Sequence, residues 1–307
     1  LLENGANSSF VNKIMDENLP PAQIVFDPVE DARAHVSKIH EGIPLPKDIF
    51  APRQNSHGID LNDERSADKL LKSIRAYKGI QRNVTSILAH DHCNGGGNGV
   101  ANECPANISR VFGQVEYLPS GAVDKVFEVS RFAYSKWAQT PPMLRAKALE
   151  KYADLLEKHH AELMALCVYE AGKTVLDAHL EIREAVDFCR YYSMQGRDIF
   201  DLQGHKMQGP TGESNVLTHH GRGVFVCISP WNFPLAIFTG QVVAALMAGN
   251  AVVAKPAEQA CAVAHRAVEL MHEAGIPKDV LQLVLGDGEI GGKLIAHPDV
   301  GGVAFTG

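Results

Sequence analysis

The C-terminal part of the sequence predicts an α/β fold with a doubly wound parallel sheet. Short, continuous apolar segments alternate there with helical segments. We expect strands at 223–229, 251–255, 280–285 and 300–305, and helices at 235–248, 261–274 and 289–296. Strands that are apolar throughout are typical of a parallel sheet covered by helices on both faces. Because ligands of such sheets bind beyond the carboxyl ends of the strands, function is expected in the loops 229–234, 256–259, 286–288 and 306–307.

The segments that precede this alternation differ in character. Apolar residues recur every four positions from Leu2 to Ile14 and predict a helix over 1–17. Six prolines between 18 and 56 exclude long helices and predict an extended segment. A short charged helix is expected at 60–76, and a loop rich in Gly and Asn at 89–107. We therefore predict three parts: 1–17, a linker or arm at 18–107, and a domain at 108–307.

Helices and one hairpin are expected before the first strand of the sheet. Apolar periodicity predicts helices at 120–137 and 176–195, and one helix or a helix pair at 141–171. Gly172 is a candidate C-cap, since glycine adopts the left-handed conformation that ends many helices. The polar alternation around GPTGE predicts a protruding hairpin at 205–222.

Composition excludes several classes of function. The 307 residues carry a net charge of −7, which argues against nucleic-acid binding by this segment. No apolar run is long enough for a transmembrane helix, and the N-terminus lacks the pattern of a signal peptide. It also lacks Met, so we expect the chain to be cut from something longer. Six scattered cysteines without CxxC pairs indicate reduced intracellular thiols.

The segment Pro230-Trp231-Asn232-Phe233-Pro234 follows the first predicted strand. The two prolines stiffen this loop, so Asn232 can direct its side-chain NH2 at a fixed point. Developing negative charge on a substrate oxygen needs such a donor, which is worth roughly 2.7–4 kcal/mol. A rigid turn in which the Asn side chain satisfies local backbone is the open alternative.

Weaker signals follow the next two strands. Lys255 and Glu258 can share a pair of ribose hydroxyls, or form a solvated ion pair at a helix start. Gly286-Asp287-Gly288 opens a helix and permits close approach of a phosphate, although a plain tight turn explains it as well. GxGxxG, the standard dinucleotide fingerprint, is absent.

Three further motifs are interpreted as structural. Gly172-Lys173-Thr174 lacks the upstream Gly and the strand of a phosphate-binding P-loop. His90-Asp91-His92-Cys93 resembles a metal cluster, but it lies on a Gly-rich loop without a second cluster, so no metal site is predicted. Cys227 lies inside an apolar strand, where burial makes a thiol inert, so we interpret it as packing.

In combination, CISPWNFPLAIFTGQ, AGNAVVAKPAEQ, LGDGE and VAFTG resemble the aldehyde dehydrogenase superfamily over 108–307. The resemblance implies NAD as cofactor and Asn232 as the side-chain half of an oxyanion hole. The cofactor-binding residues that it implies are Ser229, Pro230, Trp231, Thr306 and Gly307 on the nicotinamide side, Lys255 and Glu258 at the adenosine ribose, and Gly286 and Gly288 near the adenine and pyrophosphate.

Three other segments, LLENGANSSFVNKI, IPLPKDIFAPRQNSHGIDL and GPTGESNVL, are similar to the proline utilization A family. These bifunctional enzymes oxidise proline with FAD and then L-glutamate γ-semialdehyde with NAD. The resemblance implies that 1–17 is the last helix of a proline dehydrogenase barrel, with Glu3 near its FAD or proline site. It also implies a cytoplasmic bacterial homo-oligomer, with peripheral membrane association of the larger protein left open.

The aldehyde dehydrogenase mechanism uses a Cys thiolate and a Glu base that both lie downstream of the FTG motif. All six cysteines here precede that motif, at Phe305-Thr306-Gly307. We therefore expect an internal, inactive part of a larger enzyme. Two alternatives stay open: a free-standing aldehyde dehydrogenase of other specificity, and a non-catalytic dinucleotide-binding or assembly module. The hairpin at 205–222, an oligomerisation element in the family, keeps the assembly module open as an alternative.

Overall fold

The computed structural model describes residues 14–25, 27–34, 43–89 and 99–307. The chain divides into two units, Leu1–Pro46 and Lys47–Gly307. The described part of the first unit contains two short helices, α3 (Pro21–Ile24) and α4 (Pro28–Ala34). Both begin at a proline, which is favourable at the first helical position. Long helices are absent from these described residues, as predicted, but helical turns replace some of the expected extended chain. The helix predicted over 1–17, with Glu3, lies almost wholly outside the described residues.

The second unit is built on a four-stranded parallel sheet. Its strands are β5 (Val224–Ile228), β6 (Ala251–Lys255), β7 (Leu281–Leu283) and β8 (Val300–Phe305), in the order β7-β6-β5-β8. All four strands lie within the predicted ranges. Ile228 pairs with Lys255 on one side and with Phe305 on the other, so three strands end at the same edge.

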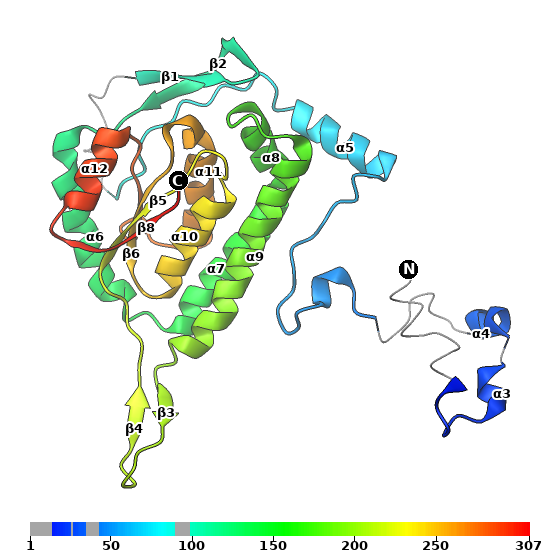
Figure 1. Cartoon of the computed structure of the whole chain (residues 1–307). Helices are drawn as coiled ribbons and strands as arrows, with labels where there is room; N and C mark the ends of the chain where they lie inside the picture. Colours follow the sequence, from blue (N-terminus) through cyan, green and yellow to red (C-terminus); the bar gives the residue numbers. More distant parts are fainter. Residues whose placement is uncertain (1–13, 26, 35–42, 90–98) are drawn as a thin grey trace. The chain divides into compact units, whose positions relative to one another are not determined.

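Helices cover both faces of the sheet, which confirms the doubly wound fold (Figure 1). On one face, α6 (Val123–Trp137) and α12 (Gly288–Ala296) pack on Val224, Val226 and Val253. On the other, α10 (Ala236–Met247) and α11 (Cys261–Glu273) pack on Cys227, Val252 and Ala254. Alternate side chains of one strand therefore enter two different cores, which is why the strands are mostly apolar on both faces.

Three more helices pack outside α10 and α11: α7 (Pro142–Lys158), α8 (His160–Tyr169) and α9 (Val175–Ile199). Residues 141–171, which were predicted to form one helix or a helix pair, form the pair α7 and α8. A short 3-10 helix, η3 (Ser120–Ala122), precedes α6, and η1 (Pro46–Asp48) and η4 (Glu258–Ala260) are two further 3-10 turns. Gly172 has a φ of +69°, as expected for a helix C-cap. No helix in the described parts of the chain meets the length and apolarity that a membrane crossing requires.

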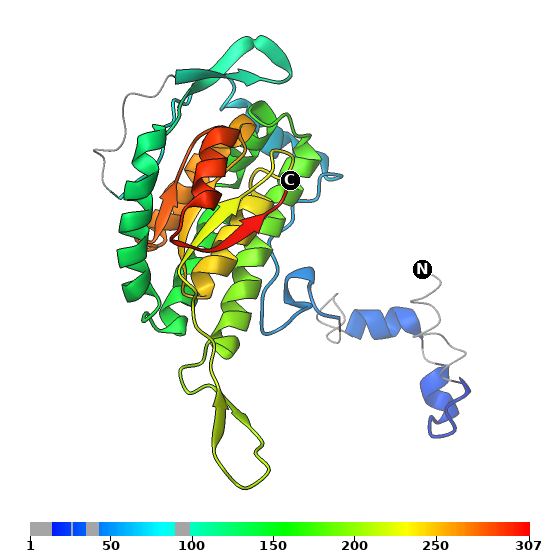
Figure 2. The same cartoon turned by 60° about the vertical axis from the view of Figure 1, so that its left-hand side comes forward.

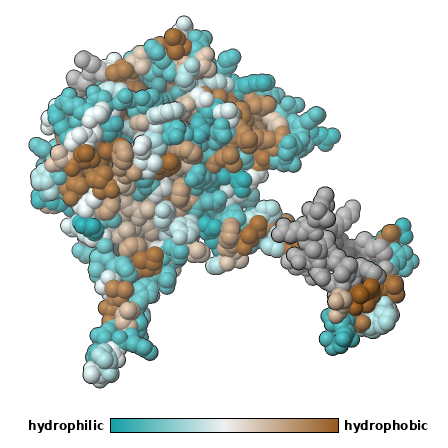
Figure 3. All heavy atoms as spheres, viewed as in Figure 1, coloured by the Kyte–Doolittle hydropathy of each residue, from teal (hydrophilic) through white to brown (hydrophobic). Residues whose placement is uncertain are grey.

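The predicted hairpin is present as β3 (His205–Met207) and β4 (Asn215–Leu217), which pair in antiparallel fashion. It projects from the rest of its unit in both ribbon views (Figure 2). Met207, Val216 and Leu217 are about half exposed, and apolar side chains are visible on the hairpin in Figure 3.

A second hairpin corrects one prediction. Residues 99–107 were expected to be loop, but β1 (Gly99–Cys104) pairs with β2 (Asn107–Glu116). The Gly and Asn content suggested a loop, whereas backbone hydrogen bonds with β2 hold this segment extended. Segment 82–87 then connects the hairpin to the sheet, with bridges Val84–Val115 and Ile87–Leu283. Helix α5 (Glu64–Arg75) confirms the short charged helix.

Candidate functional site

The carboxyl ends of β5, β6 and β8 bring three predicted loops together. The Ser229 amide donates to the Lys255 carbonyl at 3.2 Å, and the Thr306 amide donates to the Ile228 carbonyl at 3.2 Å. Ser229 is 3% exposed, and its hydroxyl has no hydrogen-bond partner within the described residues. The structure thus places Ser229, Pro230, Lys255 and Thr306 at one edge of the sheet, with an unpartnered hydroxyl among them.

Trp231 and Asn232 lie on the surface beyond β5. Trp231 is 59% exposed, and Asn232 is exposed as well. Within the described parts of the chain, the Asn232 carboxamide makes no hydrogen bond, whereas its backbone carbonyl accepts one from Lys173. The alternative turn, in which the side chain satisfies local backbone, is therefore not formed. The side-chain NH2 remains available to a ligand.

Two residues that the sequence analysis did not assign to the site hold this loop. Lys173 Nζ donates to the Asn232 carbonyl at 2.8 Å and to Glu181 Oε1 at 2.9 Å. Glu181 Oε2 accepts from the amides of Leu235 and Ala236, at 3.1 and 2.8 Å. Glu181 thus caps the N-terminus of α10, where a negative charge is favoured. A charged residue within the apolar stripe of α9, between Ala178 and Ala185, was the signal that could have revealed it.

The local sequence explains how Lys173 reaches this position. Left-handed Gly172 reverses the chain after α8, and the Lys173 amide donates to the Cys167 carbonyl at 3.1 Å. Thr174 then caps α9, because its hydroxyl accepts from the Asp177 amide at 3.1 Å. The segment joins two helices, which agrees with the prediction that it is not a P-loop.

Lys255 is a buried cation with few partners. The residue is 5% exposed, and its Nζ donates to the Pro256 carbonyl at 3.2 Å. No carboxylate of the described chain lies within 4 Å of this ammonium, so the predicted alternative of a solvated ion pair is not formed. Burial lowers the pKa of Lys255, while Glu258 and Asp287 act in the opposite direction. An ammonium has three donors, so two remain for a ligand.

The turn after β7 has two different glycines. A Cβ on Gly286 would lie 2.6 Å from Cβ of Ile290, so glycine is needed for α12 to approach the strand. A Cβ on Gly288 would meet nothing within 4 Å. Asp287 Oδ1 accepts from the amides of Glu289 and Ile290, at 3.0 and 3.2 Å. Asp287 therefore occupies two of the backbone N–H groups at the N-terminus of α12. Fewer of these groups are left to bind a phosphate.

The described cysteines are all buried: Cys104, Cys167, Cys189, Cys227 and Cys261. Burial raises the pKa of Cys227 to about 12, and the residue packs in the apolar core between the sheet and α10. This confirms its interpretation as packing. No group of residues in the described ranges could hold a metal ion, and the His90–Cys93 cluster lies outside them.

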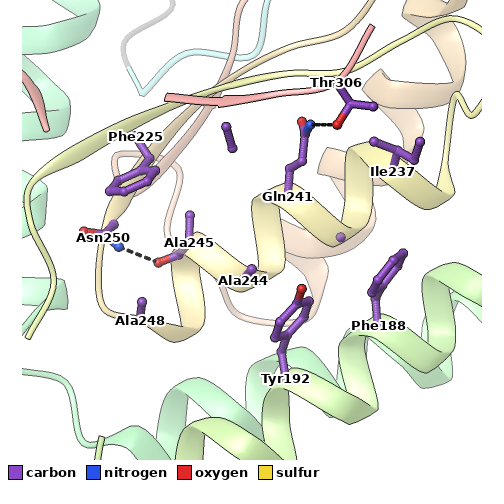
Figure 4. A pocket seen from close by; sticks show the side chains of 12 residues that line it. Phe188, Tyr192, Phe225, Ile237, Gln241, Ala244, Ala245, Ala248, Asn250 and Thr306 are labelled. Atoms are coloured by element: carbon purple, nitrogen blue, oxygen red, sulfur yellow. Dashed lines mark hydrogen bonds between the residues drawn. The ribbon is translucent and has the colours of Figure 1, made fainter. Parts of the chain in front are cut away.

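One cavity of the described structure lies on the α10 face of the sheet and extends to Thr306, beyond the carboxyl end of β8 (Figure 4). It has a volume of about 520 Å³ and is lined mainly by apolar side chains of α9, α10, β5 and β8. Thr306 lines it and accepts a hydrogen bond from Gln241 Nε2 at 2.9 Å. Thr306 is the one predicted cofactor residue among those that line this cavity. Of the others, Trp231, Glu258 and Gly288 are exposed, whereas Ser229, Pro230, Lys255 and Gly286 are buried.

A second buried carboxylate, Glu170, caps α11. It accepts from the amides of Ala262 and Val263, at 2.7 and 2.8 Å, and from Asn102 Nδ2 at 2.6 Å. Burial raises its pKa from 4.5 to about 7, although these hydrogen bonds oppose the shift. Because the pKa is higher in the folded state, its stabilising contribution is complete below the unfolded value and is lost as the pH rises toward 7.

We therefore expect Glu170→Gln to flatten the pH dependence of stability. Relative to the wild-type chain, the variant should gain up to about 3 kcal/mol between about pH 4.5 and about pH 7.5. Urea denaturation of both chains across this range measures the difference. A difference that is constant with pH would show that Glu170 ionises at the same pH in the folded and unfolded chains.

Comparison with known proteins agrees with this architecture. The family model "Aldehyde dehydrogenase family" matches residues 93–307. The bifunctional protein PutA of Salmonella typhimurium is 40% identical over 315 residues, which cover 100% of this chain and 23% of that protein. The chain thus spans about a quarter of the length of the curated relatives that it matches first. It belongs to the aldehyde dehydrogenase family.

Two solved structures show the same fold. A variant of proline utilization A from Bradyrhizobium japonicum superposes with a TM-score of 0.79 and 45% identity, over 99% of this chain and 28% of that one. The 1-pyrroline-5-carboxylate dehydrogenase from Thermus with bound NAD has a TM-score of 0.75 and 29% identity, over 82% of this chain and 49% of that one.

Proposed function

We propose that this chain supplies the NAD site and the oxyanion amide of a dehydrogenase for L-glutamate γ-semialdehyde, within a bifunctional proline-catabolic enzyme. The observation that carries the proposal is that two side chains with free hydrogen-bond donors lie at the ends of neighbouring strands. Lys255 keeps two free donors, and the Asn232 carboxamide is free. The names of the matched relatives, bifunctional protein PutA and 1-pyrroline-5-carboxylate dehydrogenase, support this substrate.

The residues at the strand ends suit a dinucleotide. The buried Lys255 ammonium and the exposed Glu258 carboxylate can bind the two hydroxyls of the adenosine ribose. Gly286 and Gly288 line the adenine side, with open space at Gly288. Ser229, Pro230, Trp231, Thr306 and Gly307 border the nicotinamide, which accepts the hydride of the aldehyde carbon when NAD is bound.

Asn232 stabilises the negative charge that develops on the aldehyde oxygen. Its carboxamide NH2 donates a hydrogen bond to that oxygen when a thiolate attacks the carbonyl carbon. Because the cysteines of the described chain are all buried, we propose that sequence beyond Gly307 supplies the thiol and the Glu base. The FAD of the proline-oxidising half likewise belongs to the larger protein.

A chimera tests the proposal. This chain would replace the matching segment of the Salmonella typhimurium relative, and the chimera would be assayed for NADH formation from NAD and L-glutamate γ-semialdehyde. We expect turnover within about tenfold of the intact relative. A folded chimera that binds NAD but leaves the aldehyde unchanged would exclude the proposed substrate.

The role of Lys255 can be measured separately in this chain. Lys255→Met removes two donors from the ribose site, so the Kd for NAD should rise about 10- to 100-fold, the range for hydrogen bonds to a charged group. Calorimetric titration measures the change. Lys293→Met is the matched control, because Lys293 is an exposed α12 lysine paired with Glu289. Equal affinities for both variants would show that Lys255 does not bind the cofactor.

The assembly and location of the protein are also proposals. The half-exposed Met207, Val216 and Leu217 support the β3–β4 hairpin as a contact between copies in a homo-oligomer. The names of bacterial relatives support a cytoplasmic enzyme that acts on a small molecule.

A further inference from the structure

The Lys173 ammonium lies at the centre of three contacts. It donates to the Asn232 carbonyl and to Glu181, and it lies 4.7 Å from the centroid of the Phe233 ring. Its side chain is 15% exposed, and that of Glu181 is 1% exposed. One cation therefore contacts two consecutive loop residues and a buried carboxylate of α9, in surroundings where electrostatic interactions are strong.

The loop has little else to hold it. Within the described residues, the bond from Lys173 is the one side-chain hydrogen bond to Pro230–Pro234. Pro230 and Pro234 lack an N–H, and Trp231, Asn232 and Phe233 are exposed. Glu181 fixes the residues that follow, through the amides of Leu235 and Ala236. Lys173 is thus the link between the middle of the loop and the fixed N-terminus of α10.

We propose that Lys173 is a positioning residue for the oxyanion donor. Its bond fixes the carbonyl of Asn232, and with it the backbone from which the carboxamide projects. A misplacement of about 1 Å can cost a reaction a factor of about 100. The proposal rests on the proposed function, because it matters only where Asn232 meets a reacting oxygen. A different role would be purely structural: compensation of the buried Glu181 charge.

A double-mutant cycle in the chimera separates these roles. Lys173→Met should lower kcat about tenfold and leave the KM for NAD within about twofold. In the Asn232→Ala background, the same change should lower kcat less than about twofold, because the donor to be positioned is gone. Lys173→Arg, which keeps the charge and the donors, should restore most of the activity. Lys151→Met is the control, since Lys151 also donates to a backbone carbonyl, that of Glu273 at 2.8 Å.

The outcomes are distinct. An equal loss of kcat in both backgrounds, or a loss explained by a smaller folded fraction, would show that Lys173 is structural and overturn the proposal. No effect of Asn232→Ala itself would overturn the proposed role of Asn232 instead. If Lys173→Met prevents folding, combining it with Glu181→Gln removes the carboxylate charge left without its partner as well as the donor to Asn232. This pair should show the same tenfold loss and the same dependence on Asn232, and a wild-type kcat would contradict the proposal.

Discussion

An Asn232→Ala variant of the chimera is expected to fold normally and to lose about 10²- to 10³-fold in kcat, the usual effect of removing one oxyanion donor. The loss should fall on kcat because the carboxamide acts on charge that appears only in the transition state. Stability should change little, since Asn232 is exposed and its side chain makes no hydrogen bond within the described structure. Steady-state kinetics with both substrates measures the effect.

Asn62→Ala is a suitable control, because Asn62 is an exposed asparagine on a different segment. It should leave kcat within about twofold of the parent chimera, as expected for a surface change away from the site. Turnover by Asn232→Ala at the parent rate would contradict the oxyanion role. A loss confined to the KM for NAD would instead assign Asn232 to cofactor binding.

A Glu181→Ala variant of this chain should lose about 3–5 kcal/mol of unfolding free energy, the range for breaking a buried ion pair. The change leaves the Lys173 ammonium without its carboxylate and the buried amides of Leu235 and Ala236 without their acceptor. Urea denaturation at neutral pH measures the loss.

The matched control is Glu289→Ala, which removes an exposed carboxylate paired with Lys293 on α12. It should cost no more than about 1 kcal/mol. Similar losses for the two variants would mean that water replaces Glu181 at little cost, and the loop would then lack the rigid support described above.

The strands and helices of the sheet could be predicted because their signals are local. Val224–Ile228 is apolar throughout, and Ala251–Lys255 is apolar up to its last residue. The helix that follows the first strand is apolar on nearly all sides, and the helix that follows the second is amphipathic. Such patterns determine whether a segment is a strand or a helix. Because the strands are parallel, Asn232 and Lys255 then lie at the same edge of the sheet, where the carboxyl ends meet. The strand Gly99–Cys104 was missed because its composition favours a loop, and its pairing depends on residues 107–116.

The support of the site could not be predicted for a similar reason. Lys173 and Asn232 are 59 positions apart in sequence, and their contact depends on how α9 packs against α10. The two prolines and the family resemblance suggested Asn232 as the proposed oxyanion donor, but they did not reveal the Lys173 cation that holds its backbone. Gly172 and Thr174, on either side of Lys173, are explained locally as the caps of two helices. Nothing in this short motif therefore indicated that Lys173 contacts Asn232.

The central claim is that the strand ends of this chain form an NAD site, and titration of the 307-residue chain with NAD tests it most directly. Of its two tryptophans, Trp137 is buried and Trp231 is exposed beside the proposed nicotinamide position. We predict saturable binding at one site per chain by calorimetry, with a parallel change in fluorescence that disappears in Trp231→Phe. A folded chain that shows no saturable binding, or a fluorescence change that persists in Trp231→Phe, would contradict the account.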